Sequence, residues 1–219
     1  MNAIKNYQQL RAEAANFSYK LFGQLKRTDL NNAGRLLGIL HKGILMFDDE
    51  GTGGTNMHHF ADFAIFDYYN VEGSNVVQRY WQQNKGQLSK VEERLIQAYL
   101  KAHSSLFSVI EIDPKKSTVK LQDLFDDNHQ VEITDISMSQ SPLVKDCLIF
   151  TRVLTVDSFN MTSGVSFVFP KDKGEILHKK YRTMIKQSVG YTPQAKNFIV
   201  FLKLSHKLGV QIDMLHLNP

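Results

Sequence analysis

The stretch from residue 106 to residue 136 reads LFSVIEIDPKKSTVKLQDLFDDNHQVEITDI. Three short segments in it, 106–112, 118–125 and 130–136, are rich in β-branched and aromatic residues, and polar turns separate them. Short segments of this composition between turns such as Asp113-Pro114-Lys115-Lys116 are typical of antiparallel strands. The stretch therefore predicts the start of an antiparallel sheet.

The same pattern of short segments rich in β-branched and aromatic residues continues beyond this stretch. Residues 146–156 and 161–169 form two further segments of this kind, joined by polar residues. Five strands with tight connections predict an antiparallel meander of five or six strands, closed or partly closed into a barrel. We expect an α+β protein with a helical region over 1–103, a barrel-like region over 104–170, and basic C-terminal helices over 171–219 that pack on the rest.

Five helices are predicted before the strands. Apolar residues recur at steps of three and four from Tyr7 to Leu25, which is the pattern of an amphipathic helix. Ser89 and Glu92 have the spacing of a capping box and predict a helix over 90–103. The other signals predict a second helix over 29–43 that ends at Gly43, a third over 57–69, and a fourth that begins after an N-cap at Ser74.

After Pro170, apolar residues again recur at the spacing that is typical of helices. Apolar residues between Ile176 and Ile185 share one helical face, and Thr192 followed by Pro193 has the pattern of an N-cap with proline in the first turn. The last helix is expected to stop at Gly209, although residues 198–204 also suit a strand.

Composition narrows the class of protein. The chain has 219 residues, of which 42% are hydrophobic and 22% are charged, which excludes a disordered or collagen-like protein. One cysteine, Cys147, excludes an internal disulfide framework and a multi-cysteine zinc or iron–sulfur site. The longest apolar runs are about five residues and no signal-peptide pattern is visible, so we expect a cytoplasmic protein without a membrane span.

A further pattern is carried by the middle of the chain. It consists of FADFAIFDY at 60–68, QRY at 78–80, LSKVEE at 88–93, SLFSV at 105–109, VKLQDL at 119–124, LIFTR at 148–152 and the Ser163-Gly164 step. This series resembles a group of uncharacterised bacterial proteins, some of which carry a cysteine-rich SEC-C zinc motif. The resemblance covers about residues 58–170 and leaves both ends of the chain outside it. The zinc motif is absent here, and the resemblance implies no activity.

The best metal-ligand candidates are His58 and Asp62. They lie four residues apart on a predicted helix and so face the same way, as two ligands of one site can. Asp67, or an acid from the loop at Asp48, Asp49 and Glu50, could complete such a site. Solvent-exposed histidines in a first helical turn are the plainer interpretation. We predict no bound cofactor, and no catalytic residue stands out.

The basic character of the chain is concentrated at its C-terminal end. Residues 171–219 carry nine basic and three acidic groups, while the whole chain has a net charge of +4. Lys179, Lys180, Arg182 and Lys186 could hold nucleic-acid phosphates, with Tyr181 or Tyr191 stacking on bases. The same residues could bind an acidic protein partner or form an ordinary solvated helix face.

Three functions are consistent with these patterns. We expect a protein that acts by binding, with nucleic acid as the leading partner. The first alternative is a metal-dependent enzyme that uses His58 and Asp62. The second is an oligomeric structural protein, with a homo-oligomer formed through the aromatic residues between Phe60 and Trp81.

Overall fold

The expected sheet is present in the computed structural model of the protein, which describes residues 3–48, 55–126, 129–190 and 192–210. Its five strands are β3 (His103–Asp113), β4 (Thr118–Asp123), β5 (Gln130–Thr134), β6 (Cys147–Val156) and β7 (Phe159–Pro170). Every neighbouring pair is antiparallel. The prediction of a five-stranded antiparallel sheet is confirmed.

The order of the strands differs from a meander. It is β5-β4-β3-β6-β7, so the chain leaves β5 at one edge and returns on the far side of β3. The short helix α6 (Ile136–Gln140) and the 3-10 helix η1 (Pro142–Asp146) make this crossing. Strand propensity does not encode which strand lies beside which, and the meander prediction is wrong at this step.

The sheet is open, and the expectation of a closed barrel is wrong. The edge strands β5 and β7 approach each other, and the side chain of Asn160 donates a hydrogen bond of 3.0 Å to the carbonyl oxygen of Glu132. No backbone ladder joins these two strands in the described chain. Register shifts in β3 and β7 bend the sheet strongly but not far enough to pair its edges.

Most of the predicted helices are present. They are α1 (Ala3–Phe22), α2 (Arg27–Leu37), α3 (Met57–Phe66), α4 (Val76–Asn84), α5 (Lys90–Leu100), α7 (Gly174–Gln187) and α8 (Pro193–Leu208). The Ser89–Glu92 capping box and the Thr192 N-cap are confirmed. Residues 198–204 are helical, and the fourth helix is capped by Asn75 instead of Ser74. Within the described residues, no helix is both long and apolar enough to cross a bilayer.

The second helix ends earlier than its glycine signal predicts. Gly38 is the C-cap, with a left-handed φ of 76°. The chain then forms the hairpin of β1 (Leu40–His41) and β2 (Ile44–Leu45), and Gly43 lies in its turn with a φ of 82°. Both glycines supply a positive φ, and the glycine nearer to the last helical turn ends the helix.

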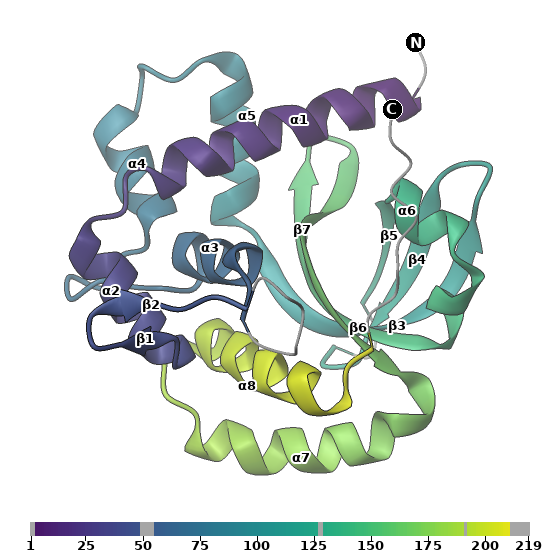
Figure 1. Ribbon diagram of the computed structural model, residues 1–219. Coiled ribbons are helices and arrows are strands. Elements are labelled where there is room, and N and C mark those ends of the chain that lie inside the picture. The colour runs from purple at the N-terminus through teal and green to yellow at the C-terminus, as the bar shows by residue number, and fades with distance from the viewer. Residues whose placement is uncertain (1–2, 49–54, 127–128, 191, 211–219) are drawn as a thin grey trace.

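The longer helices pack on one face of the sheet (Figure 1). Alternate residues of β6 face them, including Phe150 and Leu154, and join the larger hydrophobic cluster. The intervening residues, such as Ile149 and Val153, enter a smaller cluster on the other face together with Met138 of α6. Period-two alternation of this kind buries both faces of β6 and accounts for its almost continuous apolar run.

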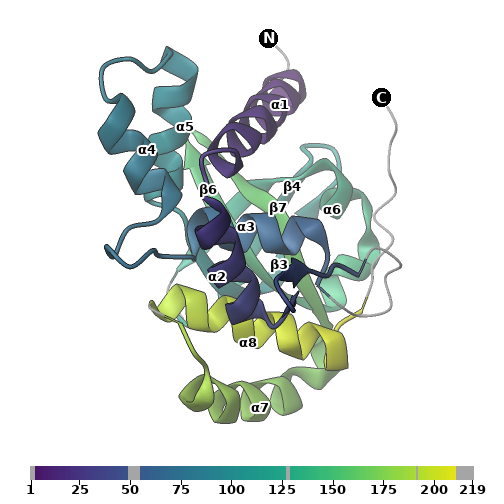
Figure 2. The same cartoon turned by 60° about the vertical axis from the view of Figure 1, so that its left-hand side comes forward.

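The C-terminal helices form two layers on this sheet. Seen from a second direction, α8 lies against the sheet and α7 lies outside α8, on the side opposite to α1 (Figure 2). Phe201 of α8 stacks on Phe150 at a centroid distance of 4.3 Å and on Tyr181 of α7 at 5.1 Å. This one buried ring therefore connects the sheet, α8 and α7.

We predict that Phe201→Ala lowers the free energy of unfolding by about 3–5 kcal/mol, because it leaves a cavity between the sheet and both C-terminal helices. Lys203→Ala, at an exposed position of the same helix, is the control and should change that free energy by less than about 0.5 kcal/mol. Urea denaturation followed by circular dichroism measures both. A loss below about 1 kcal/mol for Phe201→Ala would contradict this role.

Candidate functional site

A buried arginine interrupts the apolar face of β6. Arg152 lies between Phe150 and Leu154 on the helix-facing side, and its side chain is only 3% exposed. Its guanidinium reaches α3, where Nη2 donates to Asp67 Oδ2 at 2.5 Å and to Asp62 Oδ2 at 3.2 Å. Its Cζ atom also lies 4.4 Å from the ring centroid of Phe66. We call Arg152, Asp62 and Asp67 the Arg152 cluster.

Stability alone does not account for such a cluster. Transferring three charged groups from water to the protein interior has a large unfavourable desolvation free energy, and their mutual attraction offsets it only when their geometry is good. A protein with well-packed apolar residues at such positions is often equally stable. Asp67 Oδ1 is buried without a hydrogen-bond partner among the described residues. A buried, incompletely satisfied charge cluster of this kind makes these residues candidates for a functional site.

The strand beside Arg152 is irregular. Thr151 pairs with Ser166 and Val153 pairs with Thr162, so three residues of β7 lie opposite Arg152 alone. We call these residues, Ser163, Gly164 and Val165, the β7 bulge. The Thr151 hydroxyl donates to the Val165 carbonyl at 2.8 Å, and Gly164 has a positive φ of 102°. Bulges of this kind re-aim side chains and are frequent next to binding sites.

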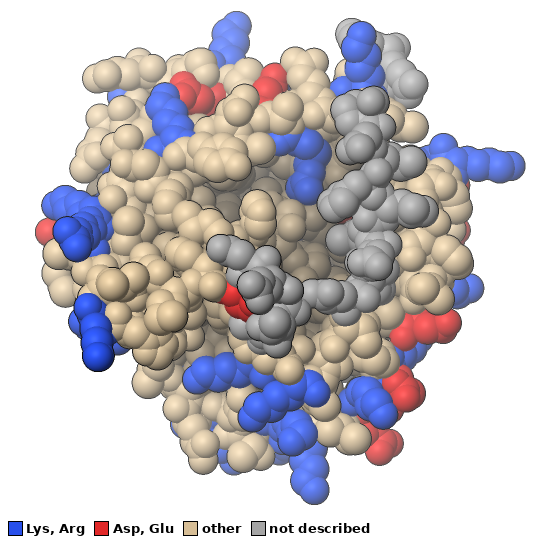
Figure 3. Space-filling view, viewed as in Figure 1, with Lys and Arg blue, Asp and Glu red and all other residues tan. Residues whose placement is uncertain are grey.

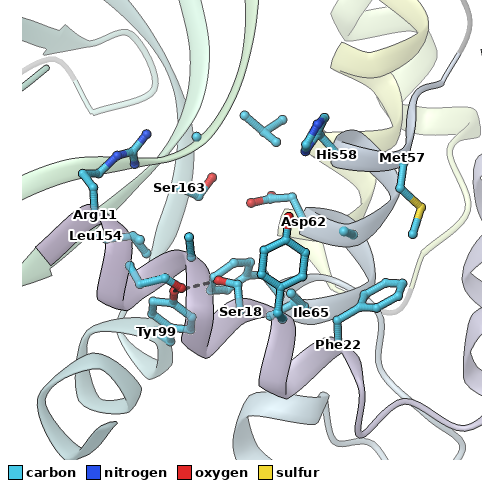
Figure 4. Close-up of a pocket in the computed structure, with 17 residues that line it drawn as sticks. Arg11, Ser18, Phe22, Met57, His58, Asp62, Ile65, Tyr99, Leu154 and Ser163 are labelled. Atoms are coloured by element: carbon cyan, nitrogen blue, oxygen red, sulfur yellow. Dashed lines mark hydrogen bonds between the residues drawn. The ribbon is translucent and has the colours of Figure 1, made fainter. Parts of the chain in front are cut away.

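A cavity of about 340 Å³ lies between α1, α3 and the β7 bulge. We call it the α1–α3 pocket. Its side chains are shown in Figure 4, and the surface is hollowed between α1 and α3 in Figure 3. Most of the lining is apolar, with Phe22, Ile65 and Leu154 as its larger members, while Asp62 of the Arg152 cluster forms part of the wall.

A few polar groups converge on this apolar pocket. Arg11 of α1 donates from Nη1 to the Thr162 carbonyl oxygen at 2.5 Å. The hydroxyl oxygen of Ser163 is buried and has no hydrogen-bond partner in the described part of the chain. Asp62 uses Oδ2 for both of its bonds to Arg152. The pocket thus presents an arginine and a carboxylate to its interior, and the Ser163 hydroxyl is buried in its wall.

Burial perturbs the acid–base properties of the residues around this site. Desolvation raises the pKa of Asp67 to about 6, against the opposing effect of the Arg152 charge. Desolvation also raises the pKa of Tyr99, in the pocket wall, to about 12. The Tyr99 hydroxyl is satisfied, since it donates to the Ala14 carbonyl oxygen at 3.0 Å.

The two predicted metal ligands meet at the pocket. His58 is exposed and Asp62 is buried, and both line the cavity from one side of α3. Within the described residues, no group of three His, Cys, Asp or Glu side chains is arranged to hold a metal ion. Asp49 and Glu50 lie outside those residues. The metal site stays a prediction.

The predicted nucleic-acid residues lie on a different surface. Lys179, Lys180, Arg182 and Lys186 are all exposed on α7, and basic side chains gather along this edge of the molecule (Figure 3). Tyr181 is half-buried: its ring stacks on Phe125 and Phe201, and its hydroxyl bonds Asn197. Tyr191 lies outside the described residues.

Sequence reasoning missed two residues of the site, Arg11 and Arg152. Arg152 carries a recognisable signal, because it occupies an inward position of the run LIFTRVL at 148–154, where the alternation calls for an apolar residue. Arg11 carries none, since an arginine beside the apolar stripe of a helix is ordinary. Cys147 is buried, and desolvation raises the pKa of its thiol.

The comparison with protein families also assigns no activity to the chain. The chain belongs to a family of unknown function, DUF7986, whose model matches residues 1–215. The match includes both ends of the chain as well as residues 58–170. No curated protein and no solved structure matches the chain. The bacterial grouping and the link to SEC-C proteins stay predictions.

We predict that Asp67 makes stability depend on pH. Its folded-state pKa of about 6 lies above the usual value, so its contribution is fully present below about pH 4 and is lost as pH rises through 6. The free energy of unfolding of the wild type, relative to Asp67→Asn, should therefore fall by about 2 kcal/mol from pH 4.5 to pH 8.

The comparison with Asp67→Asn isolates this group. His59 titrates in the opposite sense, because desolvation lowers its pKa to about 4 and its contribution is lost as pH falls. That contribution is common to both proteins and cancels in the difference. Denaturant titrations at several pH values measure it, and a difference that does not change with pH would contradict the assignment.

Proposed function

We propose that this protein binds a small organic molecule in the α1–α3 pocket. The observation that carries the proposal is an apolar cavity into which Arg11 and Asp62 present polar groups. Ligand sites are typically cavities of about 300–1,000 Å³ with a mostly apolar lining and a few convergent polar groups. The size of about 340 Å³ and the lining of this pocket meet that description.

The origin of the walls supports the same proposal. They come from α1, α3 and α5 in the N-terminal half of the chain and from the consecutive strands β6 and β7 in the C-terminal half. The Arg152 cluster ties α3 to β6 beneath the pocket. Rigid elements held by a buried network keep polar groups in position for a ligand, which lowers the entropic cost of binding.

The test uses N-phenyl-1-naphthylamine, a neutral aromatic dye that fluoresces in apolar sites. Saturable binding to the wild type is expected. Ala15→Trp places a large ring in the pocket and should weaken binding at least tenfold, while Ala12→Trp, on an exposed part of α1 away from the cavity, should not. Equal dye binding by both variants, with unchanged thermal unfolding, would contradict the proposal.

A second candidate function is nucleic-acid binding through α7. The observation that favours it is that Lys179, Arg182 and Lys186 recur at helical spacing on an exposed face. No described carboxylate lies within 4.0 Å of these residues or of Lys180. Their charges are therefore available to phosphates, and Tyr181 contributes only by holding α7 in place.

We predict that Lys179→Glu with Lys180→Glu weakens binding to labelled single-stranded RNA and reduces its salt dependence by a slope of about 2. The matched control is Lys115→Glu with Lys116→Glu, an equal charge change at exposed positions of the β3–β4 turn. Fluorescence anisotropy across a salt series measures both. Equal loss in the two variants would indicate a net-charge effect and would remove α7 as the site.

The other hypotheses receive less support. A metal-dependent enzyme at His58 and Asp62 stays a prediction, with Asp62 already paired to Arg152. The oligomeric alternative also stays a prediction, but Phe60, Phe63 and Phe66 are buried within this chain and do not form an exposed aromatic surface.

A further inference from the structure

The α1–α3 pocket is chemically divided along its length. Arg11 lies at one end, while Phe22 and Met57 lie at the other, with Ile65 beside Phe22 (Figure 4). Ser163 lies between Arg11 and Asp62 in this view. A ligand that fills the pocket therefore meets a cation at one end and apolar side chains at the other.

The charge of Arg11 is not neutralised by an ion pair. No carboxylate of the described chain lies within 4.0 Å of it, and Asp135 acts on it only at longer range. Its Nη1 bonds a backbone carbonyl oxygen, and the described residues provide no acceptor for Nη2. Any other residue at position 164 would place its Cβ atom 3.5 Å from Nη2 of Arg11. Because Gly164 has no side chain, that side of the guanidinium is not covered by one.

Asp62, the carboxylate of the pocket, differs from Arg11 because it does form an ion pair. Asp62 accepts two hydrogen bonds at Oδ2 from the buried Arg152, so it is already ion-paired, and it shares the single positive charge of that arginine with Asp67. No described donor bonds its other oxygen, Oδ1. That oxygen can accept a hydrogen bond from an N–H or O–H group of a ligand without requiring the ligand to be a cation.

We infer that the ligand of the α1–α3 pocket is an amphipathic organic anion. A carboxylate or sulfonate would bind the free Nη2 side of Arg11, an N–H or O–H group would donate to Asp62, and an aromatic or aliphatic body would lie against Ile65 and Phe22. This inference rests on the proposed function, since it assigns the chemical class of the molecule that the pocket binds.

Two dyes that differ only in charge test the inference. 1-Anilinonaphthalene-8-sulfonate has the same aromatic body and N–H group as N-phenyl-1-naphthylamine and carries a sulfonate in addition. Arg11→Gln should weaken binding of the sulfonate dye by roughly tenfold, because a charge-assisted hydrogen bond is lost. The same substitution should change binding of the neutral dye by less than about twofold.

Two control variants separate this site from others. Ala15→Trp should weaken binding of both dyes, because it fills the pocket. Lys179→Glu with Lys180→Glu should leave the affinity for the sulfonate dye unchanged, because that surface lies on the far side of the molecule from α1 (Figure 1). Thermal unfolding of every variant confirms that each one is folded.

The outcomes distinguish the inference from the proposed function. A selective loss of the sulfonate dye in Arg11→Gln supports both. If Ala15→Trp weakens both dyes while Arg11→Gln affects them equally or not at all, the pocket binds ligands but the preference for anions is wrong. If Ala15→Trp affects neither dye, both the proposed function and the inference are overturned.

Discussion

The Arg152 guanidinium requires carboxylates in the interior, and this requirement connects the sheet to the helices. Asp62 and Asp67, the residue that follows α3, meet this one side chain of β6. Because an unpaired buried charge is very unfavourable, α3 can occupy only a position that places both carboxylates on Arg152. The β7 bulge lies directly opposite that arginine. The ion cluster and the β7 bulge thus meet in the wall of the α1–α3 pocket.

The two candidate functional surfaces are far apart in the fold. The α1–α3 pocket is lined by α1 and the exposed basic residues belong to α7, and these two helices lie at opposite edges of the molecule (Figure 1). The first is concave and mostly apolar, and it favours a small ligand. The second is exposed and cationic, and it favours phosphates. The matched family covers both surfaces, and because they share no residue, each can be changed without disturbing the other.

The local elements of the fold could be predicted because their signals lie within a few residues of one another. The Ser89–Glu92 capping box and the Thr192–Pro193 start place two helix N-termini correctly. Segments rich in β-branched and aromatic residues between polar turns identify all five strands of the large sheet. Gly43 illustrates the limit, because a glycine with positive φ suits a helix C-cap and a hairpin turn equally well. The order of the strands depends on how β5, α6 and β6 pack, and no local signal carries that information.

Local sequence patterns were enough to predict the α+β class, the positions of most helices and strands, and the i, i+4 spacing that puts His58 and Asp62 on one side of α3. What those residues face depends on how distant segments pack. Arg152 is 90 residues from Asp62 and 85 from Asp67, and Arg11 is 151 residues from its acceptor at Thr162. Periodicity and capping act over about one turn, whereas ion pairs and cavities arise where distant segments pack. The α1–α3 pocket and its contacts with Arg11 and the Arg152 cluster could therefore be identified only from the three-dimensional structure.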